Sequence, residues 1–208
     1  AFFFSVQTMA TIGYGKMGPK GVAGNVLVTV EALVGLLGVA MSTGLVFAKF
    51  ARPRAHVLWS DVAVICPRDG KTTLQFRVAN ERASRIVEAS LRVSLLREEK
   101  TQEGELIRRF HDLTLIRERT AMFALSWTAL HVVDEKSPLH GETSESLAKN
   151  DCAIVCTLVG LEEELAATVQ ARHVYTHDQI RFGERLVDIM SKTPEGRRRV
   201  DYRRFHDT

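Results

Sequence analysis

The sequence contains few cysteines and little excess charge. Its 3 cysteines among 208 residues are an odd number and lack the spacing of a disulfide framework. This scarcity predicts a reducing, cytosolic setting for the charged part of the chain. The net charge of +3 is too small for the basic surface that nucleic-acid binding requires, so we expect no nucleic-acid partner.

Charge is almost absent from the first quarter of the chain. The only charged side chains in residues 1–48 are Lys16, Lys20 and Glu31. Because the apolar start lacks a basic region and a cleavage site, we do not expect a signal peptide. Residues 25–48 form an apolar-rich segment of about 24 residues, and a membrane-spanning helix needs roughly 20. We therefore predict a transmembrane helix over residues 25–52.

The flanks and the small residues of this segment fit a membrane helix. The basic residues Lys49, Arg52 and Arg54 follow it, and the positive-inside rule assigns that side to the cytoplasm. Small residues recur at spacings of three or four, as close helix packing in lipid prefers: Gly35, Gly38, Ser42 and Thr43. The alternative is a buried core helix of a soluble protein, although such helices rarely stay uncharged for so long.

The stretch TMATIGYGKM, Thr8 to Met17, places two glycines around a tyrosine just before the spanning segment. The apolar lead of residues 1–10 is too short to span a bilayer, which is typical of a re-entrant segment. Glycine backbone angles can turn consecutive carbonyl oxygens into a narrow lumen, where they replace the water shell of a potassium ion, as in the TVGYG loop of potassium channels. The alternative is an ordinary glycine-rich turn. Glu31 either packs behind such a pore wall or lines the pore.

The remaining three-quarters of the chain alternates apolar and polar residues. In TLQFRVAN the residues Leu74, Phe76 and Val78 share one face, and in VEASLRVSL five apolar residues from Val87 to Leu95 do so. Turn signals such as PRDGK and SPLHGET separate these runs. We predict about eight to ten half-buried strands in an all-β sandwich, with one helical turn near residues 144–149.

Several long stretches resemble the prokaryotic inward-rectifier potassium channels over essentially the whole sequence. AFFFSVQTMATIGYGKM is similar to their pore helix and filter, and EALVGLLGVAMSTGLVFAKFARPRA to their inner helix and its exit. RFHDLTL, LSWTALHVVDEKSPLHGET and QARHVYTHDQI resemble parts of their cytoplasmic domain. The resemblance implies a membrane pore module with a re-entrant pore helix, filter and outer loop over residues 1–24. An inner transmembrane helix over 25–52 and an all-β immunoglobulin-like cytoplasmic sandwich over 53–208 would follow.

The resemblance also implies a potassium selectivity filter. Potassium, the permeant ligand, would be held by the carbonyls of Thr11, Ile12, Gly13 and Tyr14. The Thr11 hydroxyl would form the innermost site, and Gly15 would close the filter. Ile12 stands where the family has Val. No other cofactor is expected.

Further roles carry over to the inner helix. Phe47 matches the bulky residue of the pore gate, where apolar rings can close a pore by dewetting. Val39 and Thr43 would line the pore cavity. Val39 lies where strongly rectifying relatives carry a carboxylate, so its apolar side chain argues against strong rectification. Anionic lipids, including phosphoinositide-type headgroups, would bind the basic residues Lys49, Arg52 and Arg54.

In the cytoplasmic part, the resemblance implies a constriction loop and acidic residues that face a vestibule. The loop would comprise Ala167, Thr168, Val169 and Gln170. The vestibule acids would be Glu103, Glu105 and Glu163.

The resemblance implies an assembly in a membrane. Three identical subunits would join this one in a homotetramer, in the bacterial inner membrane, with several membrane passes and the β domain in the cytoplasm. Family members carry an interfacial helix and an outer helix before the pore helix, so we expect the sequence to represent part of a longer channel. We also expect the chain to belong to the class of voltage-gated channels.

Other groups of residues admit chemical and structural interpretations. Cys152 and Cys156 could bind zinc with a histidine, or be buried thiols. His111 next to Asp112 resembles a general base with its carboxylate, but no nucleophile accompanies them, so we expect no enzyme. Three histidines could titrate near neutral pH or be structural: His131, His173 and His177.

We therefore predict a potassium-selective, inward-rectifier-type channel subunit that is gated through its cytoplasmic domain and anionic lipid. The alternative is a membrane-anchored, non-conducting interaction module that assembles through its β domain.

Overall fold

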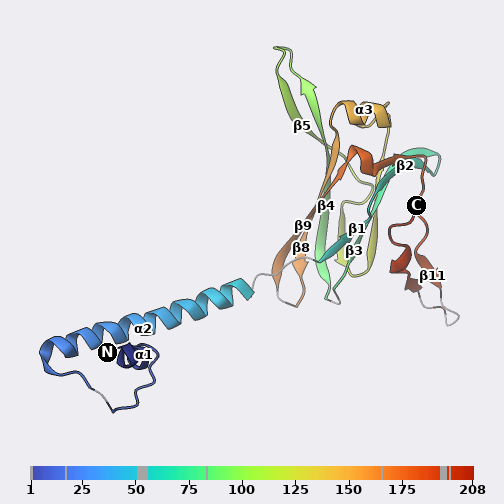
Figure 1. Cartoon of the computed structure of the whole chain (residues 1–208). Coiled ribbons are helices and arrows are strands. Elements are labelled where there is room, and N and C mark those ends of the chain that lie inside the picture. Colours follow the sequence, from blue (N-terminus) through green and yellow to red (C-terminus); the bar gives the residue numbers. More distant parts are fainter. Residues whose placement is uncertain are drawn as a thin grey trace. The chain divides into compact units, whose positions relative to one another are not determined.

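The chain divides into a helical unit, residues 1–52, and a mostly β unit, residues 53–208 (Figure 1). This computed structural model describes residues 2–16, 18–50, 56–82, 84–164, 166–192, 196 and 198–208. Of the expected site residues, Arg52 and Arg54 lie outside the described residues.

The helical unit consists of α1 (Phe2–Met9) and α2 (Gly21–Phe50). Residues Gly21–Lys49 are long and apolar enough to cross a membrane, with a mean hydropathy of 2.0. Only 6% of the most apolar window is buried, whereas a core helix of a soluble protein would be mostly buried. α2 begins four residues earlier than the sequence indicated, two residues after Pro19.

The β unit is a two-sheet sandwich with a small helix (Figure 1). The first sheet contains β1 (Val57–Trp59), β2 (Ala63–Arg68), β3 (Lys71–Asn80), β7 (Ser126–Val132) and β10 (Ile180–Phe182). The second contains β4 (Ile86–Lys100), β5 (Leu106–Asp112), β6 (Arg119–Phe123), β8 (Ala153–Glu162) and β9 (Ala167–Thr176). β11 (Met190–Lys192) pairs with β12 (Arg198–Val200), α3 spans Ser144–Lys149, and single 3-10 turns span His177–Gln179 and Tyr202–Arg204.

Alternation in β3 places the core between the two sheets. Leu74, Phe76 and Val78 are fully buried, as the period-2 pattern predicted. They belong to one apolar cluster with residues of β4, β8 and β9, including Leu91 and Ile154. The predicted helical turn at residues 144–149 is α3, which begins with a capping box between Thr143 and Ser146.

The predicted inward face of β4 is wrong at its first residue. Val87 is only partly buried, and Ile86 is 3% exposed and joins the core instead. The register with β8 shifts between Val87 and Ser90, and Glu88 has a φ of +49°. A bulge inserts one residue, so side chains before it point to the opposite face from that expected by simple alternation.

The first sheet is covered on both faces, whereas the sequence predicted half-buried strands. A C-terminal strap, residues 184–192 and 198–208, places Leu186 against the outer side of β2 and Phe205 against Ala79. The guanidinium of Arg77, on β3, donates hydrogen bonds to the strap carbonyls of Val187 and Phe205. Arg77 is therefore buried, although simple alternation along β3 places it among the polar residues that face outward.

Candidate functional site

The segment after α1 is tied to the end of that helix. The backbone amide of Thr11 donates to the Thr8 carbonyl at 3.1 Å. The amides of Ile12 and Gly13 both donate to the Gln7 carbonyl, at 2.8 and 3.4 Å. These bonds satisfy carbonyls that a helix end otherwise leaves unpaired, and they fix the start of residues 11–15 relative to α1.

The sign of φ alternates along residues 11–15. The φ angles of Thr11, Gly13 and Gly15 are +56°, +58° and +72°, and the two residues between them are not positive. An alternating sign of φ can turn successive amides to one side of a chain and carbonyls to the other. Thr11 adopts this conformation although a β-branched residue pays roughly 1–3 kcal/mol for it. The predicted role of these carbonyls in holding potassium stays a prediction.

The end of α1 packs against α2 at a position that only glycine fits. A Cβ on Gly35 would lie 2.6 Å from the Met9 carbonyl oxygen and 3.0 Å from the Met9 Cα. Met9 is the last residue of α1, two residues before Thr11. The spacing of small residues in the sequence predicted close packing, but it did not identify Met9 as the neighbour.

The expected cavity, gate and lipid residues lie along α2. Val39, Thr43 and Phe47 are four residues apart, so they share one face of the helix, and all three are exposed in the single chain. The Thr43 hydroxyl donates to the Val39 carbonyl at 2.9 Å. Lys49 is exposed near the C-terminal end of α2, and Glu31 is partly buried. Their assigned roles remain predictions.

The expected constriction loop is a strand. Ala167, Thr168, Val169 and Gln170 begin β9 and pair with Val159–Glu162 of β8. Val169 is 1% exposed and belongs to the core, so its side chain cannot face a lumen. Turn residues precede this strand at 163, 164 and 166, and Ala166 has a φ of +47°. Period-2 alternation leaves Thr168 and Gln170 exposed.

The expected vestibule acids lie at opposite ends of the second sheet. Glu103 and Glu105 are exposed in the turn between β4 and β5, beyond the end where Leu96 pairs with Ala153. Glu163 is exposed beyond the other end, where Ile86 pairs with Glu162. The family resemblance placed all three acids in one vestibule-facing group, but within a single subunit Glu163 does not lie with Glu103 and Glu105.

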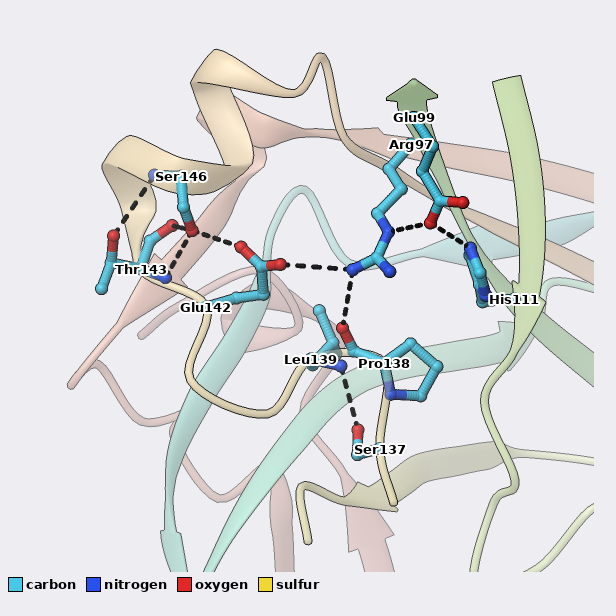
Figure 2. A network of polar contacts seen from close by, with 9 residues as sticks. All are labelled: Arg97, Glu99, His111, Ser137, Pro138, Leu139, Glu142, Thr143 and Ser146. Carbon is cyan, nitrogen blue, oxygen red and sulfur yellow. Dashed lines mark hydrogen bonds and ion pairs between the residues drawn. The ribbon is translucent and has the colours of Figure 1, made fainter. Parts of the chain in front are cut away.

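A polar network joins the β4–β5 hairpin to the segment before α3 (Figure 2). Arg97 Nε lies 2.6 Å from Glu99 Oε1, and Arg97 Nη1 lies 3.3 Å from Glu142 Oε1. His111 Nε2 contacts the same Glu99 oxygen at 2.7 Å. The sequence suggested Asp112 as the partner of His111, but the Asp112 carboxylate accepts from Ser94 instead, because neighbouring strand residues point to opposite faces.

The network should make stability depend on pH through Glu99. Its hydrogen bond from Arg97, and secondarily its contact with His111, lower the pKa of the Glu99 carboxyl. A lowered folded-state pKa stabilises the fold above the unfolded pKa, and this contribution is lost as pH falls through the folded value. We expect the urea midpoint of Glu99→Gln to lie below wild type at pH 6 and to approach it as the pH falls through the lowered pKa of Glu99. The neighbouring exposed Glu98→Gln serves as control, and a gap independent of pH would contradict the assignment.

The thiols Cys152 and Cys156 and the histidines His131 and His173 pack against, or hydrogen bond to, other parts of the β unit. Cys152 and Cys156 are buried and free, and burial raises the pKa of the Cys152 thiol to about 11. No metal-binding group of three or more ligands occurs among the described residues. His131 contacts the Thr114 carbonyl and the Ser137 hydroxyl, each at 2.7 Å. His173 stacks on Trp59, and burial lowers its pKa.

We expect all three cysteines to resist a maleimide at pH 8 in the folded protein. Burial limits access to all three thiols, and it also raises the pKa of Cys152 and Cys156, which suppresses thiolate formation there. Mass spectrometry should find almost no adduct under native conditions and three adducts in urea. Rapid native labelling of Cys156 in β8, or of Cys152 just before it, would show that this part of the sheet opens.

Comparison with known proteins covers both units. A family model described as inward rectifier potassium channel C-terminal domain matches residues 57–208, and one described as ion channel matches residues 1–52. Inward rectifier potassium channel Kirbac3.1 of Paramagnetospirillum magnetotacticum is 49% identical over 207 residues, which covers 100% of this chain and 70% of that protein. Inward rectifier potassium channel 4 of Homo sapiens is 38% identical over 224 residues, covering 100% of this chain and 48% of the relative.

G protein-activated inward rectifier potassium channel 1 of Bos taurus is 36% identical over 217 residues, covering 100% of this chain and 43% of the relative. The chain thus spans 70% of the bacterial relative and less than half of the two animal ones. The relatives are inward rectifiers, so the association with voltage-gated channels is wrong. By the matched domain models and the 49% identity to Kirbac3.1 over 207 residues, the chain belongs to the inward rectifier potassium channel family.

Proposed function

We propose that the chain is a pore-forming subunit of a potassium-selective channel, with residues 11–15 as its filter. The observation that best supports this is the alternating backbone of Thr11, Gly13 and Gly15. Such an alternation would turn the carbonyls of one chain to one side, where they could replace the hydration shell of potassium.

One such row forms only part of a ring, so the proposed channel needs four copies around a cyclic axis. Potassium would pass between adjacent sites by knock-on. The C-terminal end of α1 would add a negative helix dipole near the filter entrance and favour a cation there. The exposed apolar surface of α2 is explained if lipid and neighbouring copies cover it.

Gating in this proposal acts at the inner end of α2. Exposed Phe47 side chains from four copies would form an apolar constriction that closes by dewetting. Lys49, with Arg52 and Arg54, would attract anionic headgroups, each basic residue contributing about 1 kcal/mol near an anionic leaflet. The β unit would lie in the cytoplasm and transmit signals by rigid-body shifts between subunits.

Potassium-over-sodium flux into liposomes tests this function, with the longest available form of the protein. Wild type should give barium-blocked, potassium-selective uptake. Gly13→Ala should abolish it, because a Cβ is strained at the positive φ of this residue. Uptake that survives the substitution with unchanged selectivity would contradict the filter assignment.

The alternative is a membrane-anchored, non-conducting module. It would be favoured if a folded tetramer conducted neither as wild type nor as Phe47→Ala. If Phe47→Ala alone restored flux, the wild type would be a channel closed at this position.

A further inference from the structure

The C-terminal strap ends in a short turn that lies against the first sheet. Phe205 in this turn is fully buried and packs against Ala79. The backbone amide of Val187 donates to the Asp207 carbonyl at 3.1 Å, so the two ends of the strap are joined to each other. His206, which follows Phe205, is the only histidine of the strap. It is therefore the strap side chain whose charge ordinarily changes near neutral pH.

His206 contacts an aspartate of the first sheet. Its Nδ1 lies 2.9 Å from Oδ1 of Asp61, in the segment between β1 and β2, and the two side chains are 36% and 73% exposed. Nδ1 itself is buried and makes no hydrogen bond of good angle within the part of the chain that the structure describes. Attraction between charges depends on their distance rather than on this angle, so the contact holds the strap firmly only while the imidazole carries a proton.

Arg77 holds the backbone on both sides of this pair. Its amide donates to the hydroxyl of the buried Ser60, next to Asp61, at 3.0 Å. Its guanidinium donates to the carbonyl of Phe205, next to His206, at 3.3 Å. Most exposed ion pairs contribute little, because two flexible side chains must be ordered to form them. Here both backbones are already fixed, so less of that cost remains.

The other charged groups around the pair do not account for a change near neutral pH. Arg204 and Asp207, in the same turn as His206, pair with each other, with Nε 3.7 Å from Oδ2. Guanidinium and carboxylate groups ordinarily keep their charge between about pH 5.5 and 8. His173, on β9, is affected by the charge of Asp61, but burial lowers the pKa of His173, so it resists protonation. A change in strap binding over this range is therefore assigned to His206.

We propose that His206 and Asp61 form a pH-dependent latch that fastens the strap to the first sheet. Below the pH at which His206 loses its proton, the ion pair holds the end of the strap. Above that pH the attraction is lost, and the strap opens locally more often while the sandwich stays folded. Opening uncovers Val64 and Cys66, which share a buried apolar cluster with the strap residue Leu186.

Hydrogen–deuterium exchange of the full chain in detergent, at pH 5.5 and pH 8 and corrected for the intrinsic exchange rate, tests the latch. In wild type the protection of strap peptides should fall about three- to fivefold at the higher pH, while peptides of β8, in the other sheet, change little. Asp61→Asn and His206→Gln remove the charge pair, so both should show the lower strap protection at both pH values. His177→Gln removes a histidine of similar exposure, 38%, from a looser contact with Asp178 outside the strap, and should respond as wild type does.

Strap protection that does not change with pH in wild type would overturn the proposal, as would a pH response that persists in both latch variants. An equal loss of protection in β8 and in the strap would show that the pair stabilises the whole sandwich, and this result would overturn a local latch as well. His206→Gln changes only the strap, so it decides the question if Asp61→Asn disturbs the backbone at Ser60.

Discussion

Gly35→Ala is expected to abolish potassium-selective flux while leaving α2 itself intact. The new Cβ would approach the Met9 carbonyl oxygen to 2.6 Å and the Met9 carbonyl carbon to 3.2 Å. These are backbone atoms, so α1 must move away as a whole. Overpacking of this kind costs roughly 1–3 kcal/mol, and the displacement is passed to Thr11 through the hydrogen bonds at the end of α1.

The matched control is Gly38→Ala on the same helix. A Cβ there meets nothing within 4 Å in the chain, and alanine favours a helix over glycine by about 1 kcal/mol. Flux assays should therefore find Gly38→Ala active and Gly35→Ala inactive, with tetramer content of both compared by gel filtration. Normal selectivity in Gly35→Ala would show that the contact with Met9 does not hold the filter in place.

The second large effect is expected for Gly160→Ala in β8. Its Cβ would overlap Ile86 Cγ2 and lie 3.2 Å from both the Ala89 Cα and the Val87 carbonyl oxygen. The Ile86 side chain is buried, so it cannot swing into solvent. We expect a loss of about 1–3 kcal/mol, as for other overpacked cores.

For a chain of this size each kcal/mol lowers the melting temperature by about 2–4 °C, so the total fall should be roughly 2–12 °C. Differential scanning fluorimetry would measure this fall in melting temperature. Thr157→Ala, on the same strand but partly exposed, should melt close to wild type. An unchanged melting temperature for Gly160→Ala would mean that the bulge at Glu88 can relax.

Features that depend on local pattern could be predicted from the sequence. The uncharged run over residues 32–48 indicated the spanning helix, and alternation in β3 placed Leu74, Phe76 and Val78 in the core. Features that depend on distant segments could not. The burial of Arg77 requires Phe205, which is 128 residues away, and period-2 alternation alone predicts an exposed side chain there.

The candidate site shows the same division. Motif and spacing identified residues 11–15, because the chemistry lies in consecutive backbone atoms. The docking of Gly35 on Met9 is a tertiary contact, and no residue type specifies which carbonyl a glycine will face. The strand at Ala167–Gln170 was missed because these residues were assigned to a loop through the family resemblance and not through their own alternation.

The length of α2 has a consequence for the surrounding bilayer. Its 30 residues extend about 45 Å at 1.5 Å per residue, whereas the hydrocarbon core of a bilayer is about 30 Å thick. A helix with that mismatch must tilt, or project its inner end beyond the acyl chains. Phe47 lies near that end, so a thicker or thinner membrane would shift the depth at which its ring sits relative to the headgroups.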